Sequence, residues 1–361
     1  MDSTIVKKRN TTVDIIKGFA IIAVVLLHIN FNFPKWHLLN IDSICGSLWH
    51  VAVFFVVSGW FLKDSRLLNF KTFTRGKVVN LYVKALYVYI PLVLLHNVFL
   101  KLGWLFGNFK YRHGTMEEYS IVQTIYHIIC QFLFTKREPF SGAMWFVDSL
   151  FLGLLMYSVV TIFVSKCFKA CTEKEKVFIR FVICFMLAFV SAAMRDTFGI
   201  NIPKVSNTLS AIVLICTGHF LGQHKIDFDN KLLFLFALGV FFQYTVLAPN
   251  INLGENQYKD VVSLIVSSVS ALYVFGFIGK NIAQTLLGGL IEHIGKESFW
   301  IMGFHMVGFH VFTSVLALFG VEFSAHFTTP DIGNNVFLLL GYLLFGVGIP
   351  LVIKHLCFNN I

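Results

Sequence analysis

Three ionisable side chains fall within one apolar run near the N-terminus and could carry out acid–base chemistry inside a membrane. The run 13–31 contains Asp14, Lys17 and His28. On a helix with about 100° per residue, Lys17 and His28 point in nearly the same direction and lie about 16 Å apart along the axis. Asp14 precedes Lys17 by one turn, within reach of an ion pair. The spacing predicts an ion pair near one membrane surface and, towards the other, an imidazole that accepts protons near neutral pH.

Ionisable residues inside a membrane are costly, so they indicate functional sites by default. Asp14 and Lys17 could also mark only the membrane interface, and His28 could make only a helix–helix contact. His50, in the run 44–62, is expected at a depth near that of His28. There it is either catalytic or the buried hydrogen-bond partner of a neighbouring helix.

Two further candidates lie in later apolar runs. His305 is expected near the membrane midplane, whereas His310 points in another direction and is expected to pack. Trp145 and Asp148 fall just inside the outer surface, and Trp145 could simply belong to the aromatic belt. Asp148 is more costly there and could hold a histidine in its working tautomer. The candidate catalytic residues are therefore His28, His50, His305 and Asp148.

A basic segment follows the second apolar run. The residues 63–79 are expected to form a cytoplasmic loop with five Lys and Arg residues, among them Arg75 and Lys77. Positive-inside anchoring explains all of them. The alternative is a site for a phosphorylated cytosolic ligand, favoured because Lys17 opens onto the same side. In that interpretation Lys17, Arg75 and Lys77 bind the ligand.

The composition excludes several classes of protein. Of 361 residues, 57% are hydrophobic and only 13% are charged, about half the usual charged share. This is too little to cover a soluble protein of this size. The net charge of +10 is spread over short segments between apolar runs, which favours membrane orientation over nucleic-acid binding. The seven cysteines lie apart, so we expect free packing thiols and no metal site.

About ten apolar runs are long enough to predict membrane spans. They are 13–31, 44–62, 80–100, 145–164, 177–194, 206–222, 231–247, 261–279, 297–319 and 334–355. The shorter run 121–134 is expected to be an interfacial or re-entrant helix. The sequence therefore predicts an all-α polytopic membrane helix bundle.

The placement of Lys and Arg predicts the orientation of this bundle. With the N-terminus inside, the inner segments hold about twice as many Lys and Arg as the outer segments. Both termini are therefore expected in the cytoplasm. The longest segment between spans, 101–143, is expected to form an extracytoplasmic cap. The residues 1–361 are then a single membrane domain.

The candidate residues together resemble a known pattern. The chain is similar to the acyltransferase-3 family, and in part to its fucose 4-O-acetylase-like subgroup. The motifs are Asp14-Ile15-Ile16-Lys17-Gly18 with His28, His50, Phe54-Phe55-Val56-Val57-Ser58-Gly59, Trp145-Phe146, and Ile294-Gly295-Lys296-Glu297-Ser298 with His305. One departure concerns the R-x-x-R that many members carry before the third helix, followed by Pro. Here the stretch from Arg75 to Asn80 lacks the second Arg and the Pro.

The resemblance implies O-acyl transfer across a bacterial cytoplasmic membrane. Such proteins are understood to take an acyl group, usually acetyl from acetyl-CoA, and place it on a hydroxyl of a glycan or another acceptor. The resemblance places the nucleotide of acetyl-CoA at Lys17, Arg75 and Lys77. The pantetheine arm then brings the thioester to His28, which acts as general base or briefly holds the acyl group.

Two other functions stay open at this point. A transporter or flippase for polysaccharides or lipid-linked sugars also has many spans and intramembrane charge. The sequence contains neither an inverted repeat nor matching broken helices, which argues against this class. A scaffold that has lost activity within a complex of polysaccharide-synthesis proteins is the third possibility. The expected partners of an enzyme are the lipid bilayer and an extracytoplasmic glycan acceptor, with acetyl-CoA as co-substrate.

Overall fold

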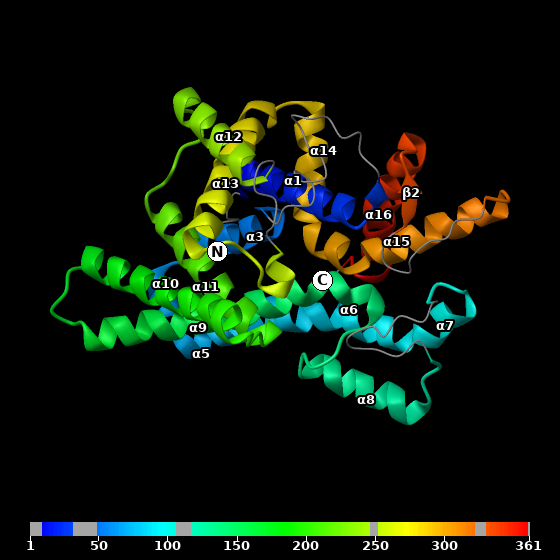
Figure 1. Cartoon of the computed structure of the whole chain (residues 1–361), viewed down its shortest axis with the longest axis horizontal. Coiled ribbons are helices and arrows are strands. Elements are labelled where there is room, and N and C mark those ends of the chain that lie inside the picture. Colours follow the sequence, from blue (N-terminus) through cyan, green and yellow to red (C-terminus); the bar gives the residue numbers. More distant parts are fainter. Residues whose placement is uncertain (1–8, 32–48, 106–116, 246–251, 322–329, 360–361) are drawn as a thin grey trace, which may run out of the picture.

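The structure, a computed structural model, describes residues 9–31, 49–105, 117–245, 252–321 and 330–359, and helices hold most of them (Figure 1). Seven helices of the described residues are long and apolar enough to cross a membrane. They are Phe70–Leu94 (α5 Phe70–Lys77, η1 Val78–Tyr82 and α6 Val83–Leu94), Pro139–Cys167 (η2 Pro139–Met144 and α9 Trp145–Cys167), α10 Glu173–Phe198, α11 Pro203–Gln223, α13 Val261–Ile282, α15 Ser298–Leu318 and α16 Val336–Cys357. The prediction of an all-α polytopic helix bundle is confirmed.

The remaining three predicted spans are helices of less than full membrane-spanning length. They are α1 (Thr11–Leu27, 17 residues), α3 (Trp49–Trp60, 12 residues) and α12 (Lys231–Thr245, 15 residues). Each of the ten predicted runs thus contains a helix. Residues 44–48 of the second run and 246–247 of the seventh run lie outside the described residues.

Two segments predicted as cytoplasmic loops are helical. The segment 63–79 contains α4 (Asp64–Leu67) and α5, and α5 continues without a break through η1 into α6. Asn69 caps α5 by accepting a hydrogen bond from the backbone N–H of Thr72. A second helix, α14 (Leu286–Lys296), is capped by Thr285. Lys and Arg are good helix formers, so the basic residues of 63–79 are compatible with a helix and do not by themselves predict a loop.

Five further short elements of the described residues lie between the long helices. These are α7 (His96–Lys101), α8 (Ile121–Phe132) and η3 (Leu253–Glu255), with the strands β1 (Asn30–Phe31) and β2 (Asp331–Gly333). The two strands pair in parallel, Asn30 with Asp331 and Phe31 with Gly333. Helix α8 is too short to cross a membrane, and its apolar residues Ile121, Val122 and Ile125 are exposed while His127 is buried. An interfacial position for α8 stays a prediction.

Glycines allow the central helices to approach each other closely. A Cβ atom at Gly18 or Gly295 would overlap the backbone of α14 or α1 respectively, so these two helices touch through their main chains. In the same way α3 and α11 meet where Gly59 faces the carbonyl of Ile215 and Gly218 faces the carbonyl of Val56. The packing role expected of Gly59 is confirmed. These contacts fix helix α1, which carries Lys17 and leads to His28, within the bundle.

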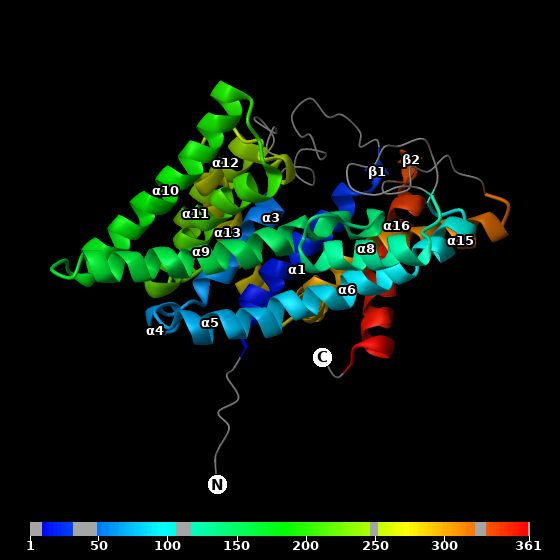
Figure 2. The same cartoon turned by 90° about the horizontal axis from the view of Figure 1, so that it is seen from below.

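The first turn of α1 and the last turn of α16 lie on one side of the molecule, and β1 and β2 lie on the other side (Figure 2). A chain that crosses a membrane an even number of times, as the ten predicted spans do, has both ends on the same side. The cytoplasmic location of that side stays a prediction.

The contact at Gly218 leads to a stability prediction. Gly218→Ala is expected to lower the free energy of unfolding by about 1–3 kcal/mol, because the new methyl group must push α3 away from α11. Thermal unfolding of the detergent-purified protein measures this effect. Gly239→Ala is the matched control, because a Cβ there meets no atom within 4 Å. Equal unfolding temperatures for the two variants would contradict this packing.

Candidate active site

His28 and His305 lie together, although the sequence places His28 towards one membrane surface and His305 near the midplane. His28 is the C-terminal cap of α1 and His305 is in the second turn of α15. Their ring centroids are 4.9 Å apart and the rings meet edge to face at 61°. His305 is fully buried and His28 is partly buried. The two imidazoles therefore form one site between α1 and α15.

Backbone carbonyls fix the tautomer of both histidines. The Nδ1 atom of His28 lies 2.8 Å from the carbonyl oxygen of Val24. The Nδ1 atom of His305 lies 3.0 Å and 3.1 Å from the carbonyl oxygens of Ile301 and Met302. A carbonyl oxygen only accepts, so Nδ1 of each neutral ring carries the proton and Nε2 is left basic. The Nε2 atom of His305 is buried without a hydrogen-bond partner among the described residues.

Of the two other histidines considered, His50 lies on a neighbouring helix and His310 lies on α15 itself. His50 is fully buried in the first turn of α3, which packs against α1. Its neighbour Trp49 stacks on Phe275 of α13 at 4.4 Å, which fixes this end of α3. His310 packs against Trp104 and Phe140, as expected of a residue that points away from the site.

Asp148 does not hold a histidine among the described residues, so this expectation is wrong. Its Oδ1 accepts a hydrogen bond from the hydroxyl of Tyr89 at 2.6 Å. Its Oδ2 accepts from Nε and one terminal nitrogen of Arg137, at 3.1 Å and 2.5 Å. The Asp148 side chain is 1% exposed. The physical reason is that the carbonyls of α1 and α15 already orient the histidines, while the buried Asp148 carboxylate needs a cation.

The expected ion pair on α1 is present. The Nζ atom of Lys17 lies 2.6 Å from Oδ1 of Asp14, and Nε of Arg9 lies 2.7 Å from Oδ2. The Asp14 side chain is 4% exposed and that of Lys17 is 20% exposed. Lys17 therefore neutralises Asp14, and its charge is only partly available to a ligand.

The two other basic candidates differ in position. Lys77 lines a pocket of about 550 Å³, and its ammonium lies 5.2 Å above the ring of Phe73. Arg75 is exposed and is not among the residues that line this pocket. The second cation of the pocket is Arg66, which sequence reasoning did not single out. Since α5 is helical, Arg75 and Lys77 point in different directions.

The rest of the pocket lining combines polar and apolar side chains. Its lining also includes Ser58, Phe61, Leu62, Ser65, Asn69, Thr72, Gly76 and Asn80. Asn69, Phe73, Lys77 and Asn80 follow a spacing of three and four residues, which is one face of a helix. This spacing could have identified the lining, had the segment been predicted as a helix.

The family model for an acyltransferase domain, acyltransferase-3, matches residues 10–355. This chain belongs to the acyltransferase-3 family. Curated proteins and solved structures give no match. The match covers His28, His305 and the basic pocket together, and it identifies the chain as a membrane acyltransferase. Membership of the fucose 4-O-acetylase-like subgroup stays a prediction.

The two imidazoles offer one of the groups that acyl transfer to a hydroxyl requires. Acyl transfer needs a base for the hydroxyl proton and a donor or dipole for the developing oxyanion. The Nε2 atoms of His28 and His305 are candidates for the base. Among the described residues no group of three or more His, Cys, Asp or Glu side chains could hold a metal ion.

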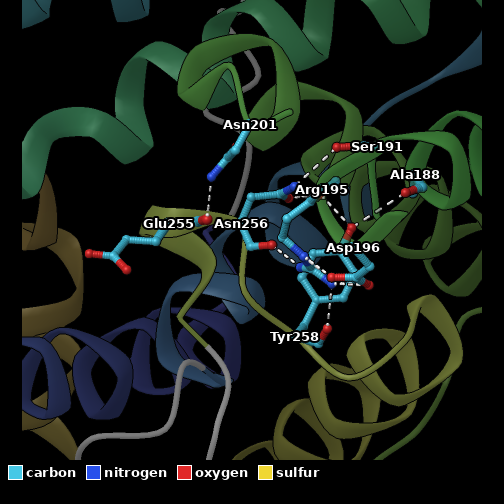
Figure 3. A network of polar contacts seen from close by, with 9 residues as sticks. Ala188, Ser191, Arg195, Asp196, Asn201, Glu255, Asn256 and Tyr258 are labelled. Carbon is cyan, nitrogen blue, oxygen red and sulfur yellow. Dashed lines mark hydrogen bonds and ion pairs between the residues drawn. The ribbon is translucent and has the colours of Figure 1, made fainter. Parts of the chain in front are cut away.

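A polar network near the start of α13 was not expected from the sequence (Figure 3). Arg195 of α10 donates to the backbone carbonyls of Asn256 and Tyr258. The Tyr258 hydroxyl lies 2.8 Å from Oγ of Ser210, and burial raises the pKa of this hydroxyl, so it stays protonated. From the sequence, Arg195 counts only among the Lys and Arg residues between the spans that predict the orientation of the bundle. No spacing in the sequence indicates that these distant residues meet.

Proposed function

We propose that this acyltransferase moves an acetyl group from cytosolic acetyl-CoA to a hydroxyl of a cell-surface or exported glycan. The observation that supports it is the His28–His305 pair, in which both Nδ1 atoms form hydrogen bonds with backbone carbonyl oxygens. The proposed location is the cytoplasmic membrane of a bacterium, with polysaccharide-synthesis proteins as neighbours.

In this mechanism Nε2 of His28 takes the proton of the acceptor hydroxyl while the hydroxyl oxygen attacks the thioester carbonyl. The C–S bond then breaks, and the proton passes from His28 to the leaving CoA thiolate. His305, whose Nε2 can only accept a hydrogen bond, orients the acceptor hydroxyl. His50 orients the acceptor or donates to the developing oxyanion. His28 is the better candidate for the base because it is the partly exposed member of the pair.

The nucleotide end of acetyl-CoA fits the basic pocket. Arg66 and Lys77 face the same space of about 550 Å³, and two like charges repel until an anion lies between them. The Asn69 and Asn80 amides add donors, while Phe61 and Phe73 offer apolar surface for an adenine ring. We keep Lys17 as a weaker contact because Asp14 already pairs with it. Arg75 is proposed only as part of the surrounding positive field.

The decisive experiment uses the purified protein in lipid nanodiscs. It is incubated with acetyl-CoA labelled in the acetyl group and with de-O-acetylated surface polysaccharide from the strain that carries the gene. Release of free CoA together with labelled, ester-linked acetate on the polysaccharide is expected. Binding of the polysaccharide without any CoA release would contradict the proposal and favour a transporter.

The nucleotide site leads to a separate prediction. Lys77→Ala and Arg66→Ala are each expected to weaken CoA binding about 10-fold or more, because a charge-assisted contact contributes about 1.5–3 kcal/mol. Calorimetry with CoA measures this in detergent. Arg75→Ala is the matched control, with at most a small effect. If Arg75→Ala weakens binding more than Lys77→Ala does, this placement is wrong.

A further inference from the structure

A short segment before α13 is fixed by an unusual number of polar contacts. The residues 252–258 contain η3 and a two-way backbone pairing of Asn252 with Gln257, at 2.6 Å and 2.7 Å. Asn256 has a φ of 56°, a left-handed conformation that Asn tolerates better than most residues. We call residues 252–258 the outer loop.

Side chains from α10 and α11 hold the outer loop in place (Figure 3). Asn256 is fully buried. Its Oδ1 accepts from Ser210 at 2.6 Å and its Nδ2 donates to Ser191 at 3.1 Å. Arg195 donates to the carbonyls of Asn256 and Tyr258. A loop held in this way is already ordered, so a ligand that binds to it loses little affinity to loop ordering.

The outer loop brings Trp145 and Asn207 to the same glycine. Nδ2 of Asn207 donates to the carbonyl oxygen of Gly254 at 3.0 Å. A Cβ atom at Gly254 would lie 3.3 Å from Cε2 and 3.4 Å from Nε1 of Trp145. Trp145 and Asn207 therefore lie side by side across Gly254, at the starts of α9 and α11.

Asn207 and Trp145 each have a hydrogen-bonding group near Gly254 that has no partner among the described residues. Asn207 is 4% exposed, and its Oδ1 is buried without a partner among the described residues. Trp145 is partly exposed, and its indole N–H makes no hydrogen bond to a described residue. A buried acceptor without a partner costs about 1–3 kcal/mol. Such a group is best explained by a ligand or water that completes it.

Trp145, Asn207 and Gly254 lie at the opposite end of the bundle from the basic pocket. Helices α3 and α11 run in parallel, since Val56 meets Gly218 and Trp60 meets Gly222. Asn207 therefore lies at the same end as the start of α3, which carries His50. The basic pocket includes Ser58, near the other end of α3. An acceptor at Trp145 and a nucleotide at Lys77 would approach the bundle from opposite sides.

We propose that Trp145, Asn207 and Gly254 bind one sugar ring of the glycan acceptor, an inference that rests on the proposed function. A pyranose presents an apolar C–H face that stacks on an indole ring and hydroxyls that both donate and accept. The indole N–H donates to one hydroxyl, and Oδ1 of Asn207 accepts from its neighbour. Gly254 lets the outer loop lie close to the indole edge, because any side chain there would contact Trp145.

The experiment measures binding separately from catalysis. Wild type and variants in nanodiscs are titrated with the de-O-acetylated surface polysaccharide by biolayer interferometry. Trp145→Ala is expected to weaken binding about 10-fold or more, and Asn207→Ala about fivefold, from the loss of stacking and of one hydrogen bond. Trp145→Phe keeps a ring without the N–H, so its affinity should be intermediate.

Two further variants keep the test decisive if Trp145→Ala does not fold. Gly254→Leu keeps both ligand-binding residues but pushes the indole of Trp145 from its position, and it should weaken binding as Trp145→Ala does. Trp60→Ala is the matched control, a partly buried tryptophan at the other end of α3, and should bind like wild type. Unchanged binding in Trp145→Phe, Asn207→Ala and Gly254→Leu overturns the subsite, as does a wild type that does not bind the polysaccharide. Binding that depends on Trp145 in a protein that releases no CoA supports the subsite and contradicts the proposed function instead.

Discussion

His28→Ala is expected to abolish acyl transfer while the protein stays folded and inserted. Loss of a general base typically costs about 100- to 10,000-fold in rate. The cost to folding is small, because among the described residues the ring gives up one hydrogen bond, to the carbonyl of Val24, worth about 0.5–1.5 kcal/mol. His305→Ala and His50→Ala should reduce turnover less, because water can partly replace an orienting or donating group.

The measurement is acetylation of the surface polysaccharide in a deletion strain that expresses each variant, with the membrane level of each protein determined in parallel. His310→Gln is the control histidine, since His310 packs against Trp104 and Phe140 rather than in the site. If His28→Ala acetylates like wild type at equal abundance, His28 is not the base. The role of His305, whose Nε2 is also free, would then have to be tested first.

Helix periodicity and hydropathy were enough to predict the bundle and the α1 part of the site. Lys17 and Asp14 pair because one turn separates them. Such spacing is local to one helix, so a sequence contains it. The contact between His28 and His305 is not contained in this way, because the sequence places the two residues at different depths.

Contacts that depend on how distant helices rotate against each other could not be predicted. The partner of Asp148 is Arg137 in the preceding segment and Tyr89 on α6, and no pattern favoured these over a histidine. The pocket cation Arg66 was missed because 63–79 was predicted as a loop, where helical spacing carries no meaning. The contacts of Arg195 with Asn256 join segments about 60 residues apart, which only the folded chain reveals.

The Asp148–Arg137 pair leads to the largest expected effect on stability. Asp148→Ala removes the carboxylate that faces the guanidinium of Arg137 at 2.5 Å in a site where Asp148 is 1% exposed. Breaking a buried pair by removing one partner costs about 3–5 kcal/mol, because the other charge is left in a medium of low polarity. The double variant Asp148→Ala/Arg137→Met removes both charges and should recover most of that loss. Tyr89→Phe deletes only the hydroxyl that donates to Oδ1 at 2.6 Å, so a smaller loss is expected.

Activity separates a structural role of Asp148 from a catalytic one. Unfolding temperature and the yield of monodisperse protein report the fold, and polysaccharide acetylation per molecule reports the chemistry. If Asp148 only holds Arg137 and Tyr89, acetylation should return with stability in the double variant. A double variant that is as stable as wild type but as inactive as His28→Ala would show that Asp148 has a catalytic role. The comparison works because the tautomers of His28 and His305 are set by backbone carbonyls, which neither substitution removes.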